Sequence, residues 1–256
     1  MTGTQLVRFD LDGDVARLTL ARPPLNILTI AMMETLNAAL ADIARRPTVK
    51  ALVLAAEGRA FSAGVAIEDH QGDRVKPMLA AFHQIFRHLH ALECPTVAAV
   101  QGPALGGGAE LATFCDLVIA SETATVGQPE IKVGVFPPIA ALHYPTRVGQ
   151  ARARELLLSG RVLPARDAER LGLVDRVVPA GELSDAVAAA VAEFTDKSAV
   201  VLRLTKRAIR LGRDEGFEAA LARLETLYLD ELMATQDAAE GLRAFVEKRP
   251  PVWTDQ

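Results

Sequence analysis

The spacing of hydrophobic residues in the N-terminal part of the chain predicts a hairpin followed by two helices. Residues 7–11 and 16–20 alternate between apolar and polar side chains on either side of Asp12-Gly13, a dipeptide typical of tight turns. Residues 29–45 and 74–92 instead carry apolar side chains at the spacing of one helix face. The chain is therefore predicted to begin with a mixture of strands and helices.

Short apolar runs predict buried strands at residues 49–55, 96–100 and 117–120. The first two of these strands are each followed by a loop of small residues, so the succession of helix, buried strand and loop occurs twice. This recurrence favours an α/β fold of stacked β-β-α turns over a doubly wound sheet.

The pattern after residue 149 is mostly helical, apart from a strand predicted at 173–178. The predicted helices span residues 151–159, 164–171, 183–194, 200–211, 217–234 and 237–247. Pro164 suits the first turn of its helix, where a missing N–H costs nothing. Because mixed α/β structure is followed by helices alone, we expect a core of residues 1–195 and a helical region of residues 196–256.

Apolar side chains extend along the predicted C-terminal helices. Leu221, Leu224, Tyr228 and Leu232 share such a face. A helix that is apolar on more than its core-facing side buries the rest against another surface. The pattern therefore predicts a trimer or a hexamer.

The composition narrows the class of protein. The 256 residues are 50% hydrophobic, which is enough for a sizeable core, and 28 Lys and Arg against 32 Asp and Glu disfavour nucleic acid as a general partner. Two cysteines are too few for a disulfide framework or a cysteine-based zinc site. We expect no secretory signal and no membrane span, and hence a cytoplasmic protein. We also expect no metal or redox cofactor, since no motif for one is visible in the sequence.

The segment Gly102–Glu110 carries the richest chemistry. Its glycines lack the spacing of a dinucleotide fingerprint, and no Gly-Lys-Ser/Thr of a phosphate-binding loop follows. Consecutive glycines before a helix leave backbone N–H groups free to face a ligand oxygen, with Glu110 in the first helical turn. The alternative is a tight strand–helix turn with a surface glutamate that the helix dipole favours.

Two further segments follow buried strands in the same way. Residues 61–65 form a second loop of small residues, and residues 127–131 place Glu130 twenty positions beyond Glu110. N–H donors from two separate loops are the construction of an oxyanion hole. Two carboxyl groups beside such a hole can give and take a proton on one substrate. Taken singly, residues 61–65 are better explained as an ordinary loop and Glu130 as a solvated loop glutamate.

Together these three segments resemble the crotonase, or enoyl-CoA hydratase, superfamily. The resemblance extends from Arg22-Pro23 and Asn26 to the C-terminal run Phe245–Arg249. It implies a crotonase (ClpP-like) spiral of β-β-α turns with a C-terminal helical trimerisation region. It also implies a homotrimer or a dimer of trimers.

The resemblance implies catalytic roles for four residues. The N–H groups of Val65 and Gly107 would hold the thioester oxygen of an acyl-CoA substrate, and Glu110 and Glu130 would be the acid/base pair that adds water to an enoyl thioester. Coenzyme A would enter as part of the substrate, with no separate cofactor.

It also implies residues that bind coenzyme A. The backbone at Ser62, Ala63 and Ala66 would receive the adenine and pantetheine portions. Phe245 and Lys248 would pack on the adenine and pair with the nucleotide phosphate, often from a neighbouring subunit.

The sequence departs from the common family pattern at two places. Ala66 stands where an aspartate is frequent, and residues 136–144 replace a glycine-rich stretch with bulkier residues, beginning with Phe136. The 136–144 run predicts a wall beside the acyl group. The runs 65–70, 127–131 and 136–142 resemble the narrower group of cyclohexa-1,5-diene-1-carbonyl-CoA hydratase-like enzymes, from which Ala66 departs as well. His70 and His143 are expected in loops near the site, where a structural role is favoured over one in orienting the substrate.

The sequence leaves three alternative functions open. The family resemblance is also compatible with an enoyl-CoA isomerase, with an acyl-CoA hydrolase, and with a relative that binds CoA or RNA without catalysis. His83 and His90 share a predicted helix face, which makes a metal site conceivable, although surface histidines are the favoured interpretation.

Overall fold

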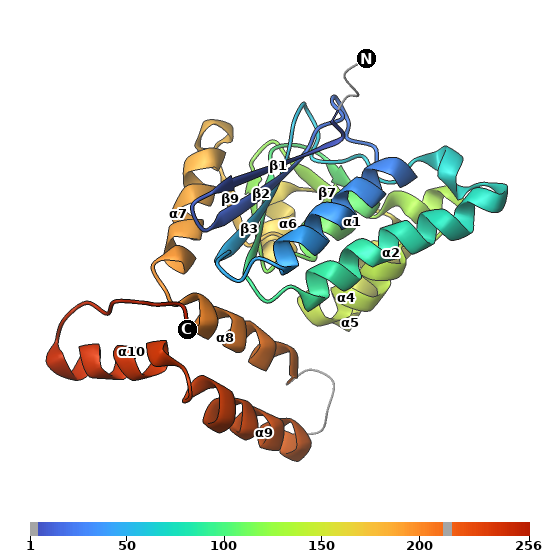
Figure 1. The fold of residues 1–256 in the computed structure, drawn as a ribbon. Coiled ribbons are helices and arrows are strands. Elements are labelled where there is room, and N and C mark those ends of the chain that lie inside the picture. Colours follow the sequence, from blue (N-terminus) through green and yellow to red (C-terminus); the bar gives the residue numbers. More distant parts are fainter. Residues whose placement is uncertain (1–4, 212–216) are drawn as a thin grey trace.

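The computed structural model describes residues 5–211 and 217–256, which form a layered α/β core and a separate group of C-terminal helices (Figure 1). The main sheet has the order β1-β2-β3-β4-β6-β9, in which β1 and β2 are antiparallel and the later pairs are parallel. Its strands are β1 (Val7–Asp12), β2 (Val15–Leu20), β3 (Ala51–Ala56), β4 (Thr96–Val100), β6 (Leu117–Ser121) and β9 (Arg176–Val178). The predicted hairpin and the three predicted buried strands are thereby confirmed.

Seven helices of the described chain surround this sheet. They are α1 (Ile30–Ala44), α2 (Val75–Ala91), α3 (Gly107–Thr113), α4 (Pro138–Val148), α5 (Gln150–Ser159), α6 (Ala165–Leu171) and α7 (Leu183–Thr195). A small second sheet has the order β5-β7-β8, from β5 (Ala104–Leu105), β7 (Thr125–Gly127) and β8 (Val162–Pro164). Pro164 therefore ends a strand and precedes α6, where the sequence predicted it inside the first helical turn.

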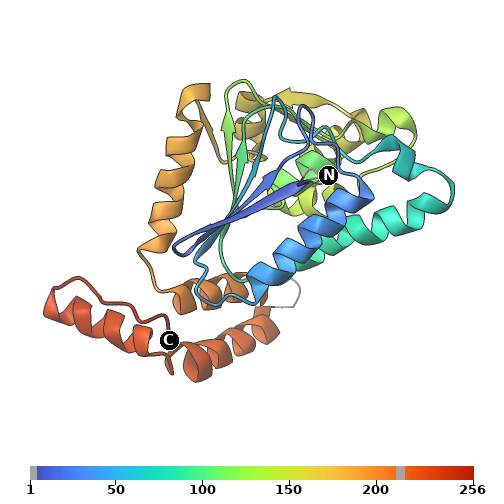
Figure 2. The same ribbon diagram turned by 45° about the horizontal axis from the view of Figure 1, so that its top comes forward.

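Alternation along the strands explains the two layers of helices. In β3, Leu52 and Leu54 point to the core shared with α1 and α2, whereas Ala51 and Val53 pack with Val187 of α7 on the other face. Figures 1 and 2 show α7 on one side of the sheet and α1 and α2 on the other. Both faces are apolar because both are covered.

Helix α4 was not predicted. The sequence predicted residues 136–144 only as a wall beside the acyl group, with His143 in a loop. In the structure Pro138 begins the helix, where proline is tolerated, and Pro145 lies inside it. His143 is consequently a helical residue, and its prediction as a loop residue was wrong.

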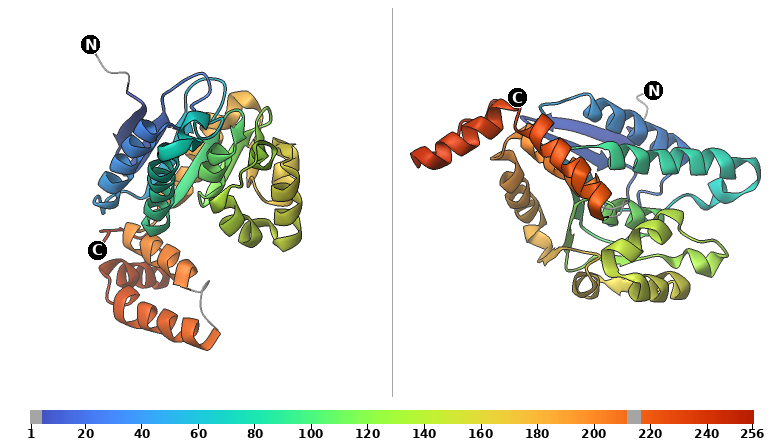
Figure 3. Two further views of the ribbon diagram at one scale, coloured as in Figure 1. Left: turned by 90° about the vertical axis from the view of Figure 1, so that its right-hand side faces the viewer. Right: turned by 90° about the horizontal axis from the view of Figure 1, so that it is seen from below.

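The C-terminal helices form a layer of their own beneath the core (Figure 3). They are α8 (Ala199–Leu211), α9 (Phe217–Thr226), a π-helical turn at Leu227–Leu232, and α10 (Gln236–Glu247). Tyr228, Leu229 and Phe245 expose most of their apolar surface, as the predicted oligomer requires, while the Leu224 side chain lies outside the described residues. The described residues contain no helix long and apolar enough to cross a membrane.

Candidate active site

Two loops of small residues lie directly against each other. The chain at Ser62 pairs with β5, where Leu105 N donates to the carbonyl of Ser62 at 2.9 Å. A Cβ added to Gly107 would lie 2.8 Å from Cγ2 of Val65, and one added to Gly64 would lie 3.1 Å from the carbonyl oxygen of Leu105. Glycine therefore allows the two loops to approach each other closely, and the 61–65 loop adjoins the start of α3 as the sequence predicted.

The backbone amides of Val65 and Gly107 are available to a ligand. Gly107 is the first residue of α3, so its N–H has no intrahelical acceptor, and the carbonyl of Pro103 receives Ser62 N instead. Around Val65, Leu28 pairs with the flanking residues, because Leu28 N donates to Gly64 O and Ala66 N donates to Leu28 O. Within the described chain neither the Val65 nor the Gly107 amide has a hydrogen-bond acceptor.

A cavity of about 800 Å³ opens in front of these amides. This volume is within the range of ligand pockets of small molecules. Its walls come from the 63–71 segment, α2, the start of α3 and residues 129–138, and most of them are apolar, including Met78, Leu79, Phe82, Val133 and Phe136. Glu110 and Glu130 are the only carboxylate-bearing residues among the described ones that line it.

Glu110 is buried at the first turn of α3. Its side chain is 2% exposed, and its Oε1 accepts a hydrogen bond from Ala140 N of α4 at 2.7 Å. Burial raises the pKa of Glu110 to about 8, the Ala140 hydrogen bond opposes this rise, and the charge of Glu130 adds to it. Glu110 therefore retains a proton into the neutral range.

Glu130 enters the same cavity from the 3₁₀ turn Pro129–Val133. Its carboxyl group lies against the α3 start, since a Cβ on Gly106 would be 2.6 Å from Oε1 of Glu130. Burial raises the pKa of Glu130 to about 7. Two carboxyl groups with raised pKa values, beside two free amides, provide the acid/base chemistry expected of an oxyanion-hole enzyme.

Of the three loop residues predicted to bind coenzyme A, one lines the cavity and two are buried without lining it. Ala63 lines the cavity, whereas Ser62 is buried and donates from Oγ to the carbonyl of Asn26 at 2.8 Å. Ser62 Oγ also accepts from Gly64 N at 3.2 Å, so this side chain supports the loop. Ala66 is buried and does not line the cavity, and its carbonyl contacts Nδ1 of His70 at 2.9 Å.

The predicted wall and the two histidines are only partly at the site. Phe136, Pro137 and Pro138 line the cavity, but the rest of the 136–144 run turns into α4 and does not. His70 lines it from the 3₁₀ turn Ile67–His70, whereas His143 does not and places Nε2 2.7 Å from the carbonyl of Thr113. No group of His, Cys, Asp and Glu in the described chain has the arrangement of a metal site.

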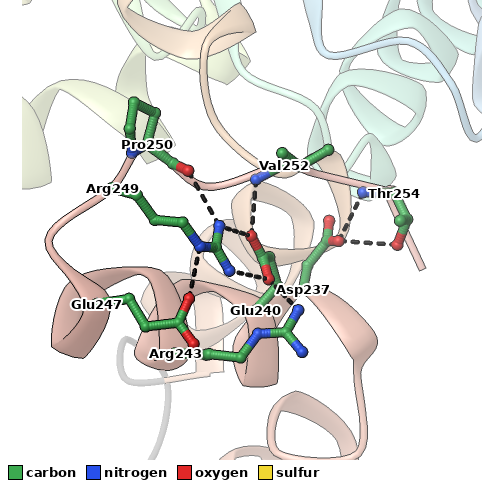
Figure 4. A network of polar contacts seen from close by, with 8 residues as sticks. All are labelled: Asp237, Glu240, Arg243, Glu247, Arg249, Pro250, Val252 and Thr254. Atoms are coloured by element: carbon green, nitrogen blue, oxygen red, sulfur yellow. Dashed lines mark hydrogen bonds and ion pairs between the residues drawn. The ribbon is translucent and has the colours of Figure 1, made fainter.

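Phe245 and Lys248 lie at the end of α10 and do not line the cavity of their own chain. The segment after them is tied down by ion pairs and backbone contacts (Figure 4). Arg249 pairs with Glu240 at 2.6 Å, and Thr254 N donates to Asp237 at 2.7 Å. Phe245 is exposed and lies outside the cavity of its own chain, so its predicted contact with coenzyme A in this cavity would require another copy of the chain.

Sequence reasoning gave no role to Gln128 or Tyr144. Both are 1% exposed, and they meet at 2.9 Å behind Glu130. Gln128 lies two residues before Glu130 in the motif that the sequence singled out, and that position was the available signal. Tyr144 had no such signal, because its proximity depends on α4.

The comparisons with known proteins agree with this fold and site. An enoyl-CoA hydratase from Mycobacterium smegmatis superposes with a TM-score of 0.93 at 32% identity, covering 97% of this chain and 99% of that one. The family model described as Enoyl-CoA hydratase/isomerase matches residues 10–256. The architecture is thus the crotonase fold, and the chain belongs to the enoyl-CoA hydratase/isomerase family.

Two relatives with assigned names indicate which members of the family this chain resembles. The chain is 39% identical over 254 residues to a cyclohexa-1,5-dienecarbonyl-CoA hydratase of Thauera aromatica, covering 98% of this chain and 96% of the relative. It is 43% identical over 247 residues to a probable enoyl-CoA hydratase of Rhizobium meliloti, covering 94% of both. These similarities confirm the resemblance to the family, and to its cyclic dienoyl-CoA hydratases, that the sequence indicated.

Proposed function

We propose that this chain is an acyl-CoA hydratase that adds water to an enoyl- or cyclic dienoyl-CoA thioester. The observation that carries the proposal is the convergence of Glu110, Glu130 and the free Val65 and Gly107 amides on one mostly apolar cavity. The names of the relatives support the same reaction class.

The proposed reaction uses these residues, the thioester and one water molecule. The oxygen of water forms a bond to carbon 3 while the C2–C3 π electrons move toward the thioester oxygen, and the two N–H donors stabilise the resulting enolate. One carboxylate accepts the proton that leaves the water, and the other, protonated carboxyl group delivers a proton to carbon 2. The pair therefore ends with the same single proton, moved from one glutamate to the other.

The substrate that we propose is a cyclic dienoyl-CoA in preference to a straight-chain enoyl-CoA. Phe136, Pro137 and Pro138 give the cavity a rigid apolar side. A flat ring fills such a space with less loss of conformational freedom than a flexible acyl chain does.

The test compares kcat/KM for the hydration of two thioesters, crotonyl-CoA and cyclohexa-1,5-diene-1-carbonyl-CoA. We expect turnover of both and a higher kcat/KM for the ring. If neither thioester is hydrated, the proposed reaction is refuted. If crotonyl-CoA has the higher kcat/KM, only the proposed substrate class is refuted. Double-bond migration without addition of water would instead indicate an isomerase, and release of free coenzyme A would indicate a hydrolase.

We also propose that a homotrimer or a dimer of trimers completes the coenzyme A site. Phe245 is 85% exposed in the single chain and Lys248 adjoins it, so both are available to a nucleotide bound by a neighbouring copy. An exposed aromatic ring with a cation beside it suits adenine and phosphate.

The pH dependence of hydration follows from the pKa values of the two glutamates. Activity requires one proton on the pair, so kcat/KM should rise as the pH increases through about 7 and fall again above about 8. Both limbs lie well above the ordinary glutamate pKa because burial raises both values. A pH–rate profile checks this, and activity that stays constant from pH 5 to pH 7 would contradict the shared proton.

A further inference from the structure

A chain of buried polar groups extends from Glu130 away from the cavity. The side-chain nitrogen of Gln128 donates to Oε1 and Oε2 of Glu130 at 3.1 and 3.2 Å, in the amide orientation that satisfies its neighbours. The same nitrogen is 3.3 Å from the carbonyl oxygen of Gly106, and the Gln128 oxygen accepts from the Tyr144 hydroxyl at 2.9 Å. Thr113 of α3 also adjoins that hydroxyl.

The two outer members of this chain are shielded from solvent and do not line the cavity. Gln128 and Tyr144 are each 1% exposed, and neither contributes to the cavity wall. A buried amide with an unpaired oxygen or nitrogen is costly, so the Tyr144 hydroxyl stabilises the orientation that turns the Gln128 nitrogen toward Glu130. In the opposite orientation the Gln128 oxygen would face a carboxylate.

The hydroxyl also acts on the charge of Glu130. The O–H of Tyr144 and the N–H of Gln128 point in the same sense, with their positive ends toward the carboxylate. Dipoles aligned in this way favour the ionised form of Glu130 over the neutral form. Their effect opposes that of burial.

We propose that Tyr144 is a positioning residue, which acts through Gln128 to hold the Glu130 carboxylate in place and in its ionised form. The inference rests on the proposed hydratase function for its kinetic consequence, although the contact itself does not. α4 would thus contribute to both glutamates, through Ala140 N at Glu110 and through Tyr144 at Glu130.

Other titratable groups lie near Glu130. Glu110 faces it from α3, Lys132 lies on the same 3₁₀ turn, and His70 lines the cavity from the 67–70 turn. Tyr144→Phe replaces none of these side chains, so a matched comparison isolates the contribution of the hydroxyl.

The test replaces Tyr144 with phenylalanine and uses Tyr228→Phe, an exposed hydroxyl in the C-terminal layer, as the control. The pKa of Glu130 is measured by carbon-13 NMR of carboxyl-labelled glutamate without substrate, with Glu130→Gln assigning the signal. We expect Tyr144→Phe to raise this pKa by about half a unit or more and to lower kcat roughly fivefold with KM unchanged. Tyr228→Phe should change neither quantity.

A double-variant cycle separates positioning from packing. Gln128→Met removes the amide, so adding Tyr144→Phe to it should cause no further rise in the Glu130 pKa. An unchanged pKa in Tyr144→Phe, or an equal rise in the Gln128→Met background, would overturn the proposal. If wild type hydrates no enoyl-CoA but the pKa still shifts as expected, the hydratase function fails and the positioning role stands.

If Tyr144→Phe does not fold, fluorotyrosine incorporation tests the same contact with the side chain in place. A fluorinated phenol is the stronger donor and should lower the pKa of Glu130. No change would overturn the proposal. Incorporation also labels the other tyrosine, Tyr228, which is exposed in the C-terminal layer, so the same measurement in Tyr228→Phe isolates the effect of Tyr144.

Discussion

Replacing Glu110 with glutamine is expected to lower kcat for enoyl-CoA hydration by roughly 10²- to 10⁴-fold. Glutamine has nearly the same shape, and its oxygen can keep the hydrogen bond from Ala140 N, but it cannot exchange a proton. The loss should therefore fall on kcat, with KM changed little. Steady-state kinetics on the preferred thioester measures both parameters.

The matched control is Glu122→Gln, at an exposed glutamate just after β6. It should retain full activity. Full activity in Glu110→Gln would refute the two-glutamate mechanism.

The raised pKa of Glu110 also makes the stability of the protein depend on pH. Burial raises this pKa from 4.5 to about 8, so between these values the folded protein holds a proton that the unfolded chain loses. The free energy of unfolding of the wild type should therefore decline as the pH rises from about 4.5 to about 8, and Glu110→Gln should remove part of that decline.

Removal of the Gly107 amide is expected to have the second large effect. Gly107→Pro takes away the N–H, yet proline is tolerated at the first residue of a helix. Loss of one oxyanion-hole donor costs roughly 10²- to 10³-fold in kcat in other enzymes that stabilise an oxyanion. The same loss is expected here, measured as kcat for hydration.

The added side-chain atoms require their own control. A Cβ at this position would lie 2.8 Å from Val65 Cγ2 and 2.9 Å from Phe82 Cζ, in alanine as in proline. Gly107→Ala carries the same Cβ contacts but keeps the N–H, so the difference between the two variants reports the replacement of the donor by the proline ring carbon. Equal activity of the proline and alanine variants would show that this amide does not stabilise the reacting oxygen.

The sequence predicted those parts of the fold that depend on local periodicity. The hairpin, α1, α2 and the helix that begins at Gly107 follow from spacing and turn chemistry. The strands β5, β7 and β8 were missed because they have two or three residues each and form only through pairing with one another. α4 was missed because its prolines obscure the helical pattern.

The site also has features that the sequence predicted and features that depend on packing. Glu110, Glu130 and the two loops could be found because each belongs to a short run with its own chemistry, and a resemblance joined them. The contact between Gln128 and Tyr144 joins residues sixteen positions apart on different elements, and no local pattern marks it. The burial that raises both glutamate pKa values likewise comes from packing that only the structure provides.

The central claim is the addition of water across a thioester-conjugated double bond, and the fate of solvent oxygen tests it most directly. The purified chain is incubated with the enoyl-CoA in water enriched in heavy oxygen, and the thioester product is analysed by mass spectrometry. We predict a product heavier by one water, with the label on carbon 3 and the thioester intact. A product of unchanged mass, or a labelled free acid beside free coenzyme A, would contradict the claim.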